Sequence, residues 1–221
     1  MADPPAEPGT DLPLPERAGY RLILAVMKGQ KLPFVVGGAM GLAVHTGLAT
    51  REGLEVYLRE DAATPMLSAL ANAGCRITAH PSDPCAKVTY GVVTARVWWG
   101  LPLPLTNRID DAWFLSAKRA RVADLKVFVA PAEELLWIRL ASERERSSRS
   151  EIGDIVAAAG SVFDWPRLLS RVSGLESLLL SHLFLLFHTQ RAEAEKSIPA
   201  WVITGLFEKT GLGVDSEGPM P

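Results

Sequence analysis

Residues 35–58 read VVGGAMGLAVHTGLATREGLEVYL, and this stretch decides the fold. Two β-branched residues run into a Gly-Gly pair, small residues follow over 39–46, and an apolar strand pattern returns at 54–58. Glycine lets the backbone turn tightly and approach a neighbour closely. The pattern therefore predicts a short buried strand, a tight turn, a helix lying close against a sheet, and a second strand.

The flanking sequence continues the alternation of strands and helices. Helical spacing over 17–27 predicts an opening helix that stops before Pro33, and 61–73 predicts another, with Pro65 in its first turn and Gly74 as its terminator. Strands are expected over 76–78, 87–93, 95–99 and 126–129. Their short spacing favours a mixed, partly antiparallel sheet.

The pattern becomes helical at Pro131, where two acidic residues follow at the positive end of a helix dipole. Further helices are expected over 151–159, 165–172, 175–187 and 199–209. We therefore expect an α/β (α+β) core over 17–130, a helical bundle packed on it over 131–210, and disordered tails at 1–16 and 211–221. The side chains expected to form the buried faces of the bundle are Leu135, Trp137, Leu168, Leu183 and Trp201.

Composition limits the function classes. A chain of 221 residues that is 48% hydrophobic can bury one α/β core with a helical extension. A net charge of -2 gives no strong nucleic-acid signal, because phosphate binding needs a concentrated basic face. The acidic, Pro-rich start is not a signal peptide and no apolar run is long enough to cross a membrane, so a cytoplasmic protein with two reduced cysteines is expected.

Several short motifs occur in a characteristic order. They are VVGGA at 35–39, HTG at 45–47, LEVYL at 54–58, DDAWF at 110–114 and FDW at 163–165. In this order they resemble the nucleotidyltransferase superfamily, which has the polymerase-beta-like fold. Within it, the chain is most similar to stand-alone bacterial proteins related to the toxins of abortive-infection systems. The resemblance spans roughly residues 32–207 and implies a mixed sheet with flanking helices and a carboxy-terminal helical bundle.

The resemblance also implies a nucleotide site. Gly37 and Gly38 would let backbone N–H groups approach a nucleoside triphosphate. In the family a threonine, a basic residue and an Asp-x-Asp pair follow, and a later strand supplies a third acid. The acids hold Mg²⁺ or Mn²⁺ for transfer of a nucleoside monophosphate from ATP or another NTP to a hydroxyl. On the helix after Pro131, Arg139 takes the place of the family's lysine.

This chain departs from the acidic pattern at its centre. With the strand 54–58 aligned, the second acid falls on Glu55, the first on Gly53, and the third on Arg96. Three negative charges thus become a net charge of zero. At an effective dielectric near 20 each unit-charge contact at about 4 Å is worth roughly 4 kcal/mol, so no metal or other cofactor is expected. We instead expect Arg96 to pair with Glu55.

A second alignment stays open. If Gly53 is an extra residue in a β-bulge, Thr50, Arg51 and Glu52 take the places of the family's threonine, basic residue and first acid. Glu52 and Glu55 would then be the catalytic metal ligands of an active enzyme. Equally, Gly37-Gly38 could be only a tight turn, and His45 is expected to be structural rather than a ligand.

Three hypotheses follow from the sequence. The first is a pseudoenzyme with degenerate carboxylates that acts by binding a nucleotide through Gly37, Gly38, Thr50, Arg51, Arg96 and Arg139, or by binding a partner protein. The second is an active, metal-dependent nucleotidyltransferase that acts like the toxin of a bacterial toxin-antitoxin pair. The third is a structural or assembly subunit.

Overall fold

A computed structural model describes residues 12–47, 53–101, 109–143 and 151–211. The chain divides into two compact units, Met1–Leu135 and Leu136–Pro221. The first contains a sheet with helices, and the second is entirely helical where it is described. Each unit is treated by itself below.

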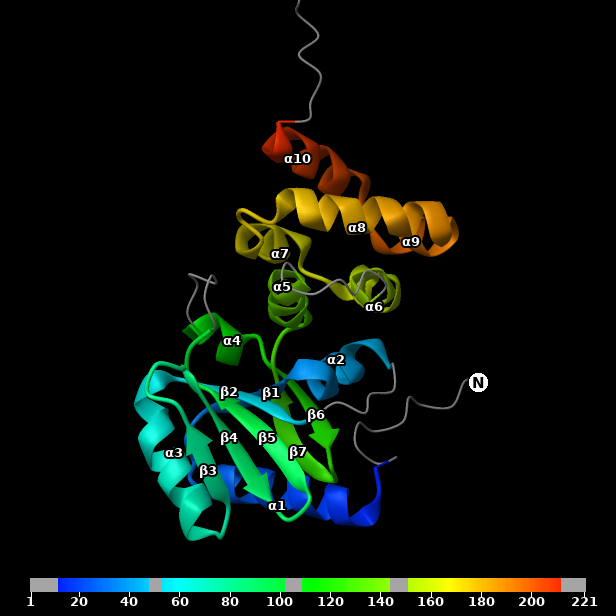
Figure 1. The fold of residues 1–221 in the computed structure, drawn as a ribbon. Coiled ribbons are helices and arrows are strands. Elements are labelled where there is room, and N and C mark those ends of the chain that lie inside the picture. Colours follow the sequence, from blue (N-terminus) through cyan, green and yellow to red (C-terminus); the bar gives the residue numbers. More distant parts are fainter. Residues whose placement is uncertain (1–11, 48–52, 102–108, 144–150, 212–221) are drawn as a thin grey trace, which may run out of the picture. The chain divides into compact units, whose positions relative to one another are not determined.

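The sheet of the first unit has seven strands in its described part, in the order β3-β4-β5-β2-β1-β7-β6 (Figure 1). The strands are β1 (Phe34–Gly37), β2 (Glu55–Leu58), β3 (Arg76–Ala79), β4 (Cys85–Tyr90), β5 (Val93–Trp98), β6 (Lys118–Val122) and β7 (Leu125–Val129). β1 is antiparallel to β2 and parallel to β7, while β2 is parallel to β5. The expected mixed, partly antiparallel sheet is confirmed.

One face of the sheet carries the hydrophobic core. Helices α1 (Leu14–Gly29) and α3 (Glu60–Asn72) cover this face, and their buried side chains pack with alternate residues of the central strands (Figure 1). On β5, for example, Val93, Ala95 and Val97 join this core. Because side chains alternate along a strand, the residues between them lie on the opposite face.

Three details of this unit differ from the sequence expectations. α1 begins at Leu14, so the expected disordered tail to residue 16 is too long: a proline in the first turn and Glu16 near the positive dipole end favour an early start. Pro65 lies inside α3 rather than in its first turn. β6 was not expected, because charged residues predominate in it and a smaller proportion of its residues is apolar than in the other strands.

A short helix, α4 (Asp111–Leu115), precedes β6 and was also not expected as an element. The Asp110 side chain caps it by accepting a hydrogen bond from the Ala112 N–H at 3.1 Å. β1 is followed directly by helix α2 (Gly38–Thr46).

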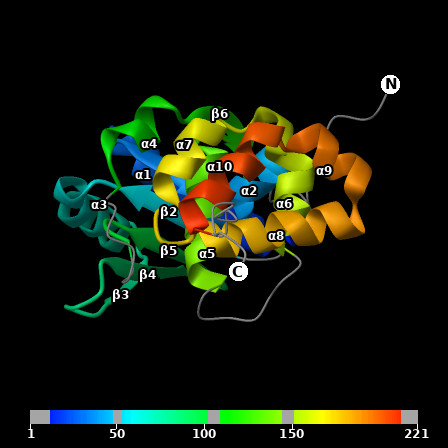
Figure 2. The same ribbon diagram turned by 90° about the horizontal axis from the view of Figure 1, so that it is seen from above.

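Helix α5 (Ala132–Glu143) crosses from the first unit into the second. The other described helices are α6 (Glu151–Ala159), α7 (Trp165–Arg171), α8 (Glu176–Thr189), α9 (Arg191–Ser197), α10 (Ala200–Thr210) and a 3-10 turn at Gly160–Val162. Within the second unit α8 packs against α6, α9 and α10 (Figure 2). None of the described helices is long and apolar enough to span a bilayer.

Most of the expected bundle core is buried: Trp137 on α5 is 2% exposed, and Leu168 and Leu183 are fully buried. The prediction for Trp201 was wrong, because it is 49% exposed at the start of α10. Helix α9 was not expected either. Its segment is rich in charged residues and has no apolar stripe that would predict a helix. In the structure Ala194 of this helix is buried.

Candidate functional site

The candidate site lies where β1 turns into α2. Gly38 has φ +59, and a Cβ on it would lie 2.8 Å from Cγ of Glu55. A Cβ on Gly37 would overlap the ring of Tyr57 and lie 2.9 Å from Cδ2 of Leu135. Both glycines are therefore required by packing against side chains of this same chain, and Gly38 also by its left-handed backbone.

Glu55 and Arg96 meet on adjacent strands beside this turn. Glu55 is paired with Gly37 across β1 and β2 and with Arg96 across β2 and β5. Arg96 Nη1 lies 3.3 Å from Glu55 Oε1, and the two side chains are 53% and 21% exposed. The predicted ion pair is confirmed.

Tyr57 completes the environment of this carboxylate. Its hydroxyl donates a hydrogen bond to Glu55 Oε2 at 2.9 Å. One carboxylate oxygen thus faces a guanidinium and the other a phenol. The sequence analysis did not single out Tyr57, although strand alternation places residues two apart on the same face and could have identified it.

Aromatic rings extend the same face of the sheet. The rings of Tyr57 and Trp113 are 5.1 Å apart at an interplanar angle of 50°, and Trp98 lies next to Tyr57 in the β2–β5 register. Trp113 is fully buried. The indole N–H groups of Trp98 and Trp113 are buried and have no hydrogen-bond partner within the described part of the chain.

His45 near the end of α2 supports the structural interpretation made from the sequence. Its Nε2 lies 2.8 Å from the carbonyl oxygen of Ala130, which follows β7. Burial lowers the pKa of His45, which keeps the imidazole neutral and suited to this hydrogen bond. The residue ties α2 to the strand that neighbours β1.

The other predicted site residues belong to different parts of the chain. Thr50, Arg51 and Glu52 fall outside the described residues. Arg139 is on α5 in the second unit. A Cβ on Gly53 would lie 3.1 Å from the Thr94 carbonyl oxygen, so the position aligned with the first acid is crowded.

The described residues do not form a donor set that suits a divalent cation. Mg²⁺ and Mn²⁺ prefer several oxygen ligands with net negative charge. Glu55 is a single carboxylate whose two oxygens are already engaged, and Arg96 adds a positive charge beside it. No cluster of three acidic, histidine or cysteine side chains was found in the described ranges.

Comparison with solved structures identifies the fold. The antibiotic-resistance factor ANT(2'')-Ia matches with a TM-score of 0.55 and 15% identity over 82% of this chain and 100% of that one. Its complex with adenylyl-2''-tobramycin matches with a TM-score of 0.53 and 13% identity, over 72% of this chain and 95% of that one. An antigenic nucleotidyltransferase-like protein from Paracoccidioides brasiliensis matches with a TM-score of 0.51 and 12% identity, over 88% of this chain and 99% of that one.

No family model and no curated protein matches the sequence. The similarity to solved structures is therefore one of fold, and the chain has the nucleotidyltransferase fold that its motifs predicted.

Proposed function

We propose that this protein is a nucleotidyltransferase-like pseudoenzyme that binds a nucleotide without a divalent metal. Its ligand would lie on the sheet face beside the β1–α2 turn, with phosphate oxygens near Arg96 and the base near Trp98. A guanidinium can hold two phosphate oxygens at once, so Arg96 supplies the positive charge that a metal would otherwise bring. Such a cation cannot activate an attacking hydroxyl, and the proposed role is therefore binding.

The observation that carries this proposal is the Arg96–Glu55 ion pair at 3.3 Å. When the sequence is aligned with the nucleotidyltransferase family that it resembles, these two positions correspond to two of that family's three metal-binding acids. Here they neutralise each other, and Tyr57 holds the second carboxylate oxygen. We further propose that the protein acts in the cytoplasm, where nucleotides are available. Binding of a partner protein is the alternative role for the same pseudoenzyme.

Titration calorimetry with ATP, GTP, CTP and UTP, each with and without Mg²⁺ or Mn²⁺, tests the proposal. We expect weak binding of at least one nucleotide that does not depend on the metal. Arg96→Ala should abolish this binding, while the control Arg76→Ala, an exposed arginine on the edge strand β3, should leave it unchanged. Tight binding that requires Mg²⁺ would overturn the proposal.

Glu55→Gln separates the pseudoenzyme from an active enzyme. In the pseudoenzyme the neutral amide releases Arg96 from its ion pair, so nucleotide affinity should rise by about two- to fivefold, as for an exposed pair. In a metal-dependent enzyme the same change removes a metal ligand, so binding and turnover should both fall. The two hypotheses thus predict effects of opposite sign from one substitution.

A metal-dependent transferase is the second candidate, favoured by the fold shared with ANT(2'')-Ia, which was solved in complex with adenylyl-2''-tobramycin. Its substrates would be an NTP and a small hydroxyl-bearing acceptor, with Glu52 and Glu55 as ligands. Stabilisation of the unmodified protein by Mn²⁺ that disappears in Glu52→Ala would place this candidate first. If no nucleotide binds under any condition, the structural or assembly role is favoured.

A further inference from the structure

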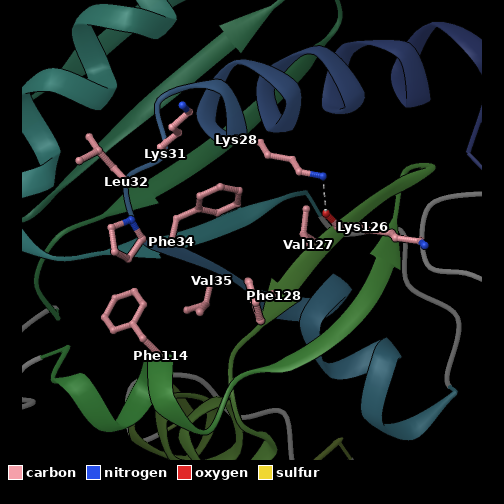
Figure 3. A pocket seen from close by; sticks show the side chains of 10 residues that line it. Lys28, Lys31, Leu32, Phe34, Val35, Phe114, Lys126, Val127 and Phe128 are labelled. Atoms are coloured by element: carbon pink, nitrogen blue, oxygen red, sulfur yellow. Dashed lines mark hydrogen bonds between the residues drawn. The ribbon is translucent and has the colours of Figure 1, made fainter.

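A pocket lies at the opposite end of β1 from the Gly-Gly turn (Figure 3). It is a pocket of about 390 Å³ within the first unit, and its volume is in the range of small-molecule sites. Its lining comes from the end of α1, the α1–β1 loop, β1, α4 and β7. The lining residues are Lys28, Lys31, Leu32, Pro33, Phe34, Val35, Phe114, Lys126, Val127 and Phe128.

The walls of this pocket are aromatic and aliphatic. Phe34, Phe114 and Phe128 present rings from three different elements (Figure 3). Phe128 is 43% exposed, and the Arg119 guanidinium lies over its ring, 5.2 Å from the centroid. Three rings around one hollow favour a flat apolar group, because aromatic rings pack well in stacked or edge-to-face arrangements.

The rim of the pocket is positively charged. Lys28 Nζ donates a hydrogen bond to the Lys126 carbonyl oxygen at 3.2 Å, so its charge is not neutralised by that contact. No acidic residue is among the lining residues, and Lys28 and Lys31 have no ion pair in the part of the chain that is described. In Figure 3 the ammonium groups of Lys31 and Lys126 point away from the rings, and Lys28 Nζ lies at the Lys126 carbonyl oxygen. Lys28 and Lys31 line the pocket, and their flexible side chains allow both ammonium groups to reach a ligand at its mouth.

Lys31 adopts a backbone conformation that is unfavourable for lysine. Its φ is +58, just past the end of α1 at Gly29. Glycine is the preferred residue at such a left-handed helix terminus, because a Cβ is disfavoured there. Glycine would therefore make the backbone more stable at this position than lysine does. The presence of lysine is consistent with a function for its side chain.

We propose that this pocket binds a small aromatic anion, with its ring system among Phe34, Phe114 and Phe128 and its charged group at Lys28 and Lys31. Phe34 and Val35 of β1 line this pocket, whereas Gly37 at the other end of the strand begins the turn of the nucleotide site, so the two sites are distinct. The charged group can be a carboxylate, a sulfonate or a phosphate, since all three accept hydrogen bonds from lysine ammonium groups.

Fluorescence titration with 1-anilinonaphthalene-8-sulfonate tests the proposal on the full chain, with N-phenyl-1-naphthylamine as the uncharged analogue of the same ring system. We expect one equivalent of the sulfonate to bind and the uncharged analogue to bind about tenfold more weakly, because two lysine contacts are lost. Equal affinity for the two probes would overturn the assignment of an anion site.

Substitutions locate the binding. Lys28→Gln combined with Lys31→Gln should weaken sulfonate binding about tenfold. Lys31→Gly should weaken it while raising the urea concentration needed for unfolding, so lost affinity cannot be attributed to misfolding. The control Lys209→Gln, an exposed lysine on α10, should change neither. If the control weakens binding as much as the pocket substitutions, or if the pocket substitutions have no effect, the proposal is wrong.

Discussion

The two ends of β1 differ in how their charged and aromatic groups are used. At the Gly37 end, Glu55 is engaged by Arg96 and Tyr57, and Trp113 is fully buried against the Tyr57 ring. At the Phe34 end, the Phe128 ring is 43% exposed, and Lys28 and Lys31 line an open pocket.

This difference shows that the fold and the local charges indicate different sites. The resemblance to nucleotidyltransferases predicts a site at the Gly37 end, where Arg96 and Glu55 form an ion pair with each other. Lys28 and Lys31, for which the described chain shows no carboxylate partner, are at the Phe34 end. Helix α4 serves both ends, because Trp113 packs on Tyr57 while its neighbour Phe114 lines the pocket.

The largest expected effect is on the packed end. Trp113→Ala should lower the free energy of unfolding by about 3–5 kcal/mol, as for other buried tryptophans, because it empties the space beside Tyr57. Urea unfolding followed by circular dichroism measures the loss. Leu115→Ala on the same helix is the control: this residue is 85% exposed, and a change below about 0.5 kcal/mol is expected. Equal losses for the two variants would contradict a packed site.

Gly37→Ala should cost about 1–3 kcal/mol of stability, because the new Cβ would overlap the ring of Tyr57 and approach Leu135. Gly29→Ala at the end of α1 is the matched control, since a Cβ there meets nothing within 4 Å. Thermal denaturation of both variants measures this difference in stability. If Gly37→Ala is as stable as the parent, the Gly-Gly pair is not explained by packing of the chain's own side chains.

His45 tests whether the helix beside the turn is shielded from water. Burial holds its pKa below the ordinary value of 6.5, so the folded state resists protonation while the unfolded state accepts it. Its contribution to stability is complete above that value and is lost as the pH falls through 6.5 towards the lower folded pKa, by up to about 1.4 kcal/mol per pH unit.

Unfolding free energies between pH 7 and pH 5 should therefore fall less steeply in His45→Gln than in the parent. His80→Gln, a change at an exposed histidine, should leave the slope as it is in the parent. Identical slopes in all three proteins would show that His45 is as accessible to protons in the folded state as in the unfolded state.

The smallest effect is expected at the open end. Phe128→Ala should cost about 1 kcal/mol or less, because the ring is partly exposed and its main polar contact is with Arg119, whose guanidinium lies 5.2 Å from the ring centroid. The same urea experiment measures it. A loss as large as that of Trp113→Ala would mean that the ring is a core residue, and the contrast between the two ends would disappear.

Much of the fold could be predicted because its signals are local. The Gly-Gly pair, the apolar strands and the Gly74 terminator are short-range features, and their order led to the correct fold. β6 and α9 could not be found in this way, since charged residues dominate both segments. Trp201 was placed in the core by its type alone, yet a large aromatic side chain can also lie at the surface.

By itself, the sequence predicted the nucleotidyltransferase fold, because the order of its motifs resembles that family and this order can be read along the chain. The alignment that puts Gly53 and Arg96 in the places of two of the family's acids stays a prediction. The sequence also predicted the Arg96–Glu55 pair. Only the tertiary structure decided that Tyr57 occupies the other carboxylate oxygen, and that the end of α1, α4 and β7 meet around a lysine-rimmed pocket. Those contacts depend on strand register and on helices far apart in sequence, which no local pattern encodes.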